Sequence, residues 1–420
     1  MNTNYTAMRE RPRRLLLCLD GVPYELIRQA RQRGLFDRFH EPSRLLSPFP
    51  TMTNVALSTM FKASAPAGYE SLYFDCERRE MRGGIGKYVG RRTADKIPSS
   101  YMDRLDYQEP LHFEFLIYVA PEKIWQTDFS RFRQCLRAHA PAQDFFAFLK
   151  STDGLLHIRG AEELNVALER LNELLRGVMK EYGQDTEIVL FSDHGMNLIE
   201  NRRVSLRTHL RSCGYEFSHN LRGASASRIA VPAFGLCGYA AIYSLNDEVA
   251  EKVADNLTEL EGVDFSICRK EDSVVVKSAQ GEARILRKVR DEETFYRYQR
   301  IAGDPLKLQP TVKRMKEWFD AEDYAPEDVW YEQTGDHSYP DVLANLYGAL
   351  FDSRVRHTAN LLVSFKDGYY YGAKAFSYLA PRLRATHGNA LSPSSNAFLM
   401  STHRTFPATV RAKEANSILC

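Results

Sequence analysis

Arg14-Leu-Leu-Leu-Cys-Leu-Asp20-Gly21 is the stretch that decides the fold. Its apolar run, Leu15 to Leu19, does not alternate with polar residues, which is typical of a strand buried on both faces in a parallel sheet. The next segment, Pro23 to Arg33, has proline at its start and Gly34 directly after its end, as helices often do. Strand, loop and helix in this order predict the unit from which doubly wound α/β folds are built.

The same pattern recurs in the middle of the chain. Apolar residues follow one another at helical spacing between Gly160 and Tyr182, which predicts a helix with one apolar stripe. A second buried strand, Glu187 to Phe191, comes next. Alternation of strands and helices predicts an α/β fold, with a doubly wound, mostly parallel central sheet flanked by helices. Further strand candidates are His112 to Val119, Asn360 to Phe365 and Ala397 to Ser401.

The pattern changes between residues 214 and 322. A strand at Tyr239 to Leu245 and a helix at Glu248 to Leu260 are predicted first. Because 420 residues exceed the size at which one hydrophobic core usually stops growing, we expect more than one unit. We predict a core formed by residues 12–213 and 323–410, with residues 214–322 inserted as a small α+β cap. Short strands are expected in the cap at Phe265 to Arg269, Ser273 to Lys277 and Ala283 to Arg287.

Charge and cysteine content argue against several classes of protein. The 56 basic residues nearly balance the 54 acidic ones, so the net charge of +2 offers no strong attraction to nucleic acid or an anionic membrane. The polar start, Met1 to Arg14, precedes an apolar run too short for a signal or transmembrane segment. We therefore expect a cytoplasmic protein without nucleic-acid or membrane partners. Seven cysteines without a CxxC pair favour reduced, mostly buried thiols.

Side chains of the types that ligate metals occur in four separated segments. Carboxylate and imidazole groups together suit zinc and related divalent ions. Taken singly, an acid after a strand is also explained by a helix cap or a solvated turn. Two of the segments follow buried strands, however, and the carboxyl ends of parallel strands meet at one edge of a sheet. The candidate ligands are Asp20, Asp153 with His157, the adjacent Asp193 and His194, and His387.

The segment Phe49-Pro-Thr-Met-Thr-Asn54 precedes a short apolar helix that begins near Val55. Thr53 would lie at the N-terminus of this helix, where threonine is a common cap. Catalysis is the alternative, because a bound divalent cation and the positive end of a helix both favour the alkoxide of a threonine.

The motifs in this order resemble those of the alkaline phosphatase superfamily, and within it the type I phosphodiesterase and nucleotide pyrophosphatase branch. The string Ser192 to Met196 is fairly specific by itself, and the ordered set is more so. The resemblance spans most of the chain, apart from residues 76–149 and the predicted insertion. The motifs that carry it are Asp20-Gly21, Pro50-Thr-Met-Thr53, Asp153-Gly-Leu-Leu-His157, Ser192-Asp-His-Gly-Met196 and Thr386-His-Gly388.

This resemblance implies a catalytic core with two divalent metal ions, zinc being the first candidate. It implies that Thr53 attacks phosphorus and is transiently phosphorylated before water hydrolyses the intermediate. It also implies the ligand sets, which are Asp153, His157 and His387 for one ion, and Asp20, Asp193 and His194, with the oxygen of Thr53, for the other.

The sequence departs from the pattern of this branch near the nucleophile. Members that cleave nucleotides have an asparagine in the segment that corresponds to Gly68 to Asp75, and none occurs here. Asn54, or backbone N–H groups near Thr53, would have to hydrogen-bond the phosphoryl oxygen instead. Asn54 is therefore our candidate substrate-binding residue, and the preference for diesters over monoesters stays open.

Two other features have ordinary explanations. The basic stretch Arg78 to Lys96 would suit closure over a phosphorylated substrate, but a solvated loop is the simpler interpretation. Tyr369 to Tyr371 favours packing in a sheet over a platform for stacking nucleobases.

The resemblance and the residues together predict a metal-dependent hydrolase. It would cleave phosphodiester or pyrophosphate bonds of a small phosphorylated substrate, for which a nucleotide is one candidate. The alternatives are a phosphomonoesterase or phosphotransferase that uses the same site, and an inactive metal-binding scaffold. A sulfatase is disfavoured because Thr53 does not lie in a Cys-x-Pro-x-Arg context.

Overall fold

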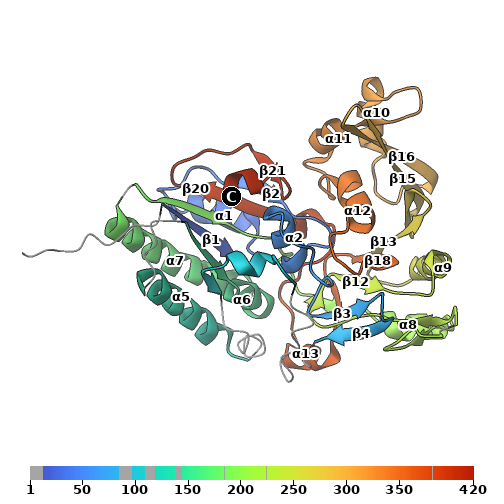
Figure 1. The fold of residues 1–420 in the computed structure, drawn as a ribbon, viewed down its shortest axis with the longest axis horizontal. Helices are drawn as coiled ribbons and strands as arrows, with labels where there is room; N and C mark the ends of the chain where they lie inside the picture. Colours follow the sequence, from blue (N-terminus) through green and yellow to red (C-terminus); the bar gives the residue numbers. More distant parts are fainter. Residues whose placement is uncertain are drawn as a thin grey trace, which may run out of the picture.

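The computed structural model contains two seven-stranded sheets that lie side by side (Figure 1). Helices cover both faces of each sheet, and the segment that leads into Thr53 packs into the core of the second one. The structure describes residues 13–84, 97–108, 119–138, 144–183, 185–223, 225–380 and 382–420.

The central sheet has the order β21 (Thr409–Arg411), β2 (Ser43–Leu46), β20 (Asn396–Ser401), β7 (Glu187–Phe191), β1 (Arg14–Leu19), β6 (Phe145–Leu149) and β5 (Tyr107–Gln108). β7, β1, β6 and β5 are parallel neighbours, and β2 is parallel to β21. β20 is antiparallel to both strands beside it, β7 and β2. The mostly parallel central sheet predicted from the two buried strands is confirmed.

Side chains of the buried strands alternate between the two faces of this sheet. Leu15 and Leu17 of β1 face one helical layer, whereas Leu16 and Cys18 face the other side. The first layer consists of α1 (Tyr24–Gln32), α5 (Pro121–Ala138), α6 (Ser151–Arg159) and α7 (Ala161–Tyr182); α5, α6 and α7 lie together in Figure 1. The opposite face packs against α2 (Thr53–Met60) and α15 (Asn416–Leu419). The helices predicted at Pro23 to Arg33 and at Gly160 to Tyr182 correspond to α1 and α7.

The second sheet is antiparallel, in the order β12 (Tyr239–Ile242), β18 (Leu361–Phe365), β13 (Val263–Lys270), β14 (Ser273–Ser278), β15 (Gly281–Arg290), β16 (Glu293–Gly303) and β17 (Ala325–Pro326). One face packs against α9 (Asp247–Leu257). The other packs against α11 (Glu327–Thr334) and α12 (Val342–Phe351), together with Phe49, Met52 and Val55.

Several expectations differ from this arrangement. The predicted strand at Asn360 to Phe365 does not join the central sheet, because its apolar residues pair with β12 and β13 as β18. The second sheet therefore extends beyond residues 214–322, and the division into core and cap stays a prediction. β6, β16 and α5 were not predicted. The strand at His112 to Val119 and the basic stretch beyond Gly84 lie almost wholly outside the described residues.

Shorter elements complete the fold. Tyr369 to Tyr371 belongs to a small sheet, as expected, in which β19 (Tyr369–Gly372) pairs with β8 (Arg202–Arg203) and β11 (Leu236–Cys237). All seven cysteines are free, but only Cys18, Cys237 and Cys268 are buried, fewer than expected. Within the described ranges, no helix combines the length and the apolar character needed to cross a membrane, and the cytoplasmic location stays a prediction. Other elements near the site are η2 (Tyr101–Arg104) and α14 (Ser392–Ser395).

Candidate metal centre

The candidate ligands meet at the carboxyl edge of the central sheet. β1, β7 and β6 are parallel, so the residues that follow them emerge at the same edge. β20 runs in the opposite direction, and the loop that precedes α14 and β20 therefore returns to this edge. The residues brought together are Asp20 after β1, Asp153 and His157 on α6, Asp193 and His194 after β7, and His387 before α14.

Thr53 lies beside the first group of ligands. His194 Nε2 is 3.5 Å from Asp20 Oδ1 and 3.4 Å from Asp193 Oδ2. Thr53 Oγ1 is 3.2 Å from Asp20 Oδ1 and 3.3 Å from His194 Nε2. One ligand atom from each of these two acids and from His194 lies within 4.8 Å of the others. The group is therefore compact enough to hold one cation next to the threonine hydroxyl.

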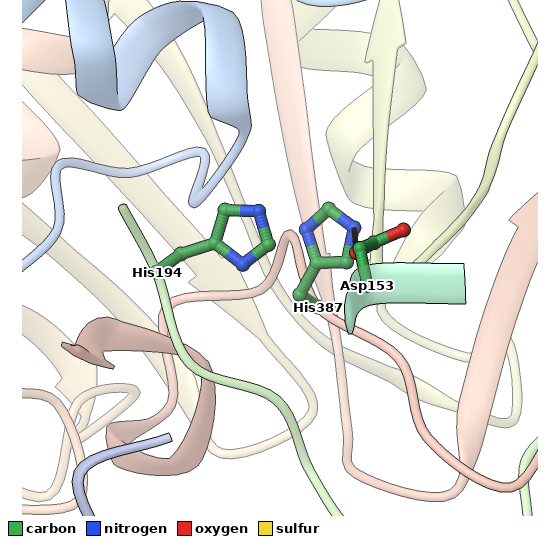
Figure 2. A group of neighbouring side chains, drawn as sticks. All are labelled: Asp153, His194 and His387. Carbon is green, nitrogen blue, oxygen red and sulfur yellow. Dashed lines mark ion pairs between the residues drawn. The ribbon is translucent and has the colours of Figure 1, made fainter. Parts of the chain in front are cut away.

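The second group surrounds Asp153. Its Oδ1 is 3.5 Å from His157 Nε2 and 3.5 Å from His387 Nε2. Figure 2 shows Asp153 beside His387, with the ring of His194 next to them. The rings of His194 and His387 stack, with centroids 3.9 Å apart. Ligand atoms of Asp153, His194 and His387 also lie within 4.8 Å of one another, so His194 borders both groups.

Backbone carbonyls fix the orientation of all three imidazoles. His157 Nδ1 is 2.7 Å from the carbonyl of Ala385, and His387 Nδ1 is 2.8 Å from that of Thr51. His194 Nδ1 is 3.0 Å from the carbonyl of Gly195. A ring nitrogen beside a carbonyl oxygen carries the proton, so Nδ1 donates in each case and Nε2 is left free as a ligand.

Burial opposes charge on several of these groups. It raises the pKa of Asp193 to about 6, and with the charges of Asp193 and Asp153 it raises the pKa of Asp20 well above its usual range. Burial lowers the pKa of His194 to about 4, and with the nearby His194 it lowers the pKa of His387 to about 3. Both imidazoles are therefore neutral near pH 7, the form that ligates metals.

The carboxylates also fit a cation. Among the described residues, Asp153 Oδ1 and Asp193 Oδ2 are buried without a hydrogen-bond partner. An unpaired buried polar atom costs roughly 1–3 kcal/mol, and more when it is charged. Divalent cations would offset this cost, and a mixture of carboxylate and imidazole ligands suits them.

The side chain of Thr53 does not cap α2. The N-cap residue of this helix is Met52, and no side-chain cap hydrogen bond forms there. The Thr53 hydroxyl is instead directed at Asp20 and His194. The structure therefore removes the capping explanation that the sequence left open.

Asn54 is held by a residue that the sequence did not single out. The hydroxyl of Tyr101, on η2, donates to Asn54 Oδ1 at 2.9 Å, which leaves the Nδ2 donors of Asn54 available. In the segment Gly68 to Asp75, Glu70 accepts hydrogen bonds from the Tyr239 hydroxyl and the N–H of Gly235. Burial raises the pKa of Glu70. Both oxygens of the Glu70 carboxyl group therefore already accept hydrogen bonds from other residues of the protein.

Two further residues join the loops of the site. Thr51 Oγ1 donates to the carbonyl of Asn389 at 3.1 Å and accepts from the N–H of Gly388 at 2.8 Å. Asn197 Oδ1 accepts from the N–H of Thr386, and the N–H of Asn197 donates to the carbonyl of Thr386. Both residues lie within or next to a recognised motif, but their partners are distant in sequence. In the sequence, their position in or beside a motif was the only feature that could have indicated a role in the site.

The described fold resembles that of phosphonoacetate hydrolase from Sinorhizobium meliloti 1021 in complex with phosphonoformate. The two sequences are 13% identical, the match covers 98% of this chain and 95% of that chain, and the TM-score is 0.51. Human ectonucleotide pyrophosphatase/phosphodiesterase 5 matches with 10% identity, 97% and 93% coverage, and a TM-score of 0.49. A search of curated protein sequences gave no significant match.

A match to a protein-family model gives the class of the protein, a phosphoric ester hydrolase of the phosphodiesterase and pyrophosphatase type. The model of the type I phosphodiesterase/nucleotide pyrophosphatase family matches residues 77–304, more than half of the chain. The protein therefore belongs to this family, whose members are metal-dependent. The matched range includes Asp153, His157, Asp193 and His194, and leaves out Asp20, Thr53 and His387.

Proposed function

We propose that the protein hydrolyses phosphodiester or pyrophosphate bonds of a small substrate through a phosphorylated Thr53. The observation that carries this proposal is the position of Thr53 Oγ1, 3.2 Å from Asp20 Oδ1 and 3.3 Å from His194 Nε2. Thr53 is also the first residue of α2, where the helix dipole favours negative charge on the hydroxyl oxygen. Its side chain is only partly buried, which leaves a route for substrate.

The ligands support two divalent ions, for which zinc is the first candidate because carboxylates and imidazoles are combined. Asp20, Asp193 and His194 would hold the ion next to Thr53. Asp153, His157 and His387 would hold the other. Bound in this way, two cations would neutralise charge on the attacking, leaving and phosphoryl oxygens and would favour the ionised form of the Thr53 hydroxyl.

The reaction consists of two displacements at phosphorus. In the first, Thr53 Oγ1 forms a bond to phosphorus while the bond to the leaving oxygen breaks. In the second, a water oxygen forms a bond to phosphorus while the bond to Oγ1 breaks, which restores the threonine. His194 and His387 have pKa values of about 4 and about 3, so both are uncharged at neutral pH and serve as ligands rather than acids.

Asn54 supplies a hydrogen bond to a phosphoryl oxygen in this proposal. Asn54→Ala should lower kcat/KM about 100-fold, the usual effect of losing one donor to a developing oxyanion. Tyr101→Phe should have a smaller effect, because it removes only the hydroxyl that orients the amide. Steady-state kinetics with a phosphodiester, together with metal analysis, measures both effects. Undiminished kcat/KM in Asn54→Ala would remove this residue from substrate binding.

Turnover of bis-p-nitrophenyl phosphate and of p-nitrophenyl phosphate tests the proposed function. We expect the diester to be cleaved at least about 10-fold faster, as the match to the type I phosphodiesterase/nucleotide pyrophosphatase family favours. Faster cleavage of the monoester would establish the phosphomonoesterase alternative. Transfer of the phosphoryl group to an added alcohol in place of water would indicate a phosphotransferase. A metal-loaded protein that cleaves neither compound would be the inactive scaffold.

A further inference from the structure

The backbone of Phe49, four residues before Thr53, is held by side chains from a distant part of the chain. Its N–H donates to Asn345 Oδ1 at 3.0 Å, and its carbonyl accepts from Arg354 Nη1 at 2.7 Å. Asn345 lies on α12, and Arg354 lies in the loop between α12 and β18. The second sheet and its helix therefore contact the segment that ends in the proposed nucleophile.

Asn345 and Arg354 also bind each other. Arg354 Nη1 donates to Asn345 Oδ1 at 3.2 Å and to the backbone carbonyl of Asn345 at 3.0 Å. Asn345 Nδ2 lies 3.4 Å from the carbonyl of Ser47. The amide, the guanidinium and both polar groups of the Phe49 backbone thus form one closed network. The ring of Phe49 is fully buried against the second sheet, which fixes the other side of this residue.

Among the described residues, Arg354 has no close ion-pair partner, although the charge of Asp352 acts on it from farther away. Within the described ranges, no carboxylate oxygen lies within 4.0 Å of its guanidinium. Arg354 lines a cavity of about 220 Å³ with three other cationic side chains, and each of those pairs with an acid. These pairs are Arg287 with Asp352, Arg411 with Asp341 and Glu327, and Lys413 with Glu327. Burial lowers the pKa of Arg354.

A partly buried guanidinium that donates to backbone carbonyl oxygens indicates a role in fixing the backbone. We propose that Arg354 and Asn345 are positioning residues, which hold the segment Phe49 to Thr53 so that Oγ1 stays beside Asp20 and His194. This inference rests on the proposed function of Thr53. A displacement of about 1 Å at a reacting atom can lower a rate by about 100-fold, so loss of the network should reduce kcat.

Arg354→Ala tests the inference. We expect kcat to fall about 100-fold, while KM changes less than about 2-fold and the metal content is unchanged. Guanidinium ion, added below denaturing concentrations, should restore part of kcat, because the cavity beside Arg354 admits a small cation. Lys413→Ala is the matched control: it removes another cation of the same cavity, but Arg411 remains paired with Glu327 and the Phe49 network is intact.

Two variants of Asn345 test whether its side-chain oxygen is what positions the segment. Asn345→Asp keeps the oxygen that accepts from Phe49 and Arg354, so it should retain most of kcat. Asn345→Ala loses that oxygen and should behave like Arg354→Ala. Equal losses in both variants, or a kcat of Arg354→Ala equal to that of Lys413→Ala, would overturn the inference.

Hydrogen exchange gives a readout that does not depend on turnover. The amide of Phe49 should exchange faster in Arg354→Ala than in wild type or Lys413→Ala. In that variant Asn345, which accepts the hydrogen bond from this amide, loses its own hydrogen bonds with Arg354. Unchanged exchange at Phe49 would overturn the inference even if kcat fell. If the wild-type protein cleaves no phosphoester, the proposed function fails, and the exchange comparison still decides whether Arg354 holds this segment.

Discussion

Thr53→Ala should abolish phosphoester turnover while both metal ions stay bound. The substitution removes Oγ1, the protein atom proposed to attack phosphorus in the first displacement, and leaves the six other protein ligands in place. We expect kcat to fall at least about 1,000-fold, which corresponds to roughly 4 kcal/mol of transition-state stabilisation. Hydrolysis of bis-p-nitrophenyl phosphate measures the loss, and elemental analysis of the same preparation measures the bound metal.

Thr59→Ala is a suitable control for this variant. Thr59 lies on the same helix, and its hydroxyl donates to the carbonyl of Val55 at 2.7 Å, away from the ligands. It should retain wild-type turnover. Because Met52, not Thr53, is the N-cap residue of α2, Thr53→Ala should also leave the melting temperature nearly unchanged. Full activity in Thr53→Ala would exclude this threonine as the nucleophile.

Removal of the metal ions should also eliminate turnover, and it should lower thermal stability. Ions that bind the native state alone stabilise it by about 4 kcal/mol when their free concentration is 1,000 times Kd. Without them, the buried carboxylates of Asp20 and Asp193 lie close together, and the raised pKa values of both groups reflect the cost of charging them there. Dialysis against a chelator, followed by calorimetry and by turnover with and without added zinc, measures both effects.

His387→Ala addresses the two proposed ligand sets separately. It should weaken binding of the ion assigned to Asp153, His157 and His387, and the ion beside Thr53 should remain. His403→Ala, which changes an exposed histidine outside the site, should bind metal like wild type. Full occupancy of both sites in His387→Ala would show that the ligand assignment is wrong. Unchanged turnover after complete removal of metal would contradict the two-ion proposal.

The elements that were predicted well are those with a strong local pattern. β1 and β7 are continuous apolar runs, and α7 has an apolar stripe at helical spacing. β6 is as apolar as β1, but Lys150 follows it in place of an acid, and it was not predicted. β16 has mixed polarity, with many partly exposed residues, so it lacks the continuous apolar run of a buried strand. The apolar pattern of β18 predicts a buried strand but not the sheet to which it belongs, since a local pattern does not specify the pairing partner.

Part of the site could also be predicted from the sequence, because its ligands follow segments with a strong local pattern. Ligand types that follow buried strands could be placed at one edge without coordinates. The sequence could not decide whether Thr53 caps its helix, because both roles require the same position. The contacts of His387 with Thr51, and of Phe49 with Arg354, join residues more than 300 positions apart and arise only from tertiary packing.

The place of β20 has a consequence for synthesis of the protein. This strand lies between β7 and β2, yet it begins only at Asn396. A nascent chain that has not yet released this residue from the ribosome has a gap in the middle of its central sheet, with the edges of β7 and β2 open to wrong pairing. His387 also emerges after all the other proposed ligands. Metal loading of the complete site is therefore expected only after residue 387 has emerged from the ribosome.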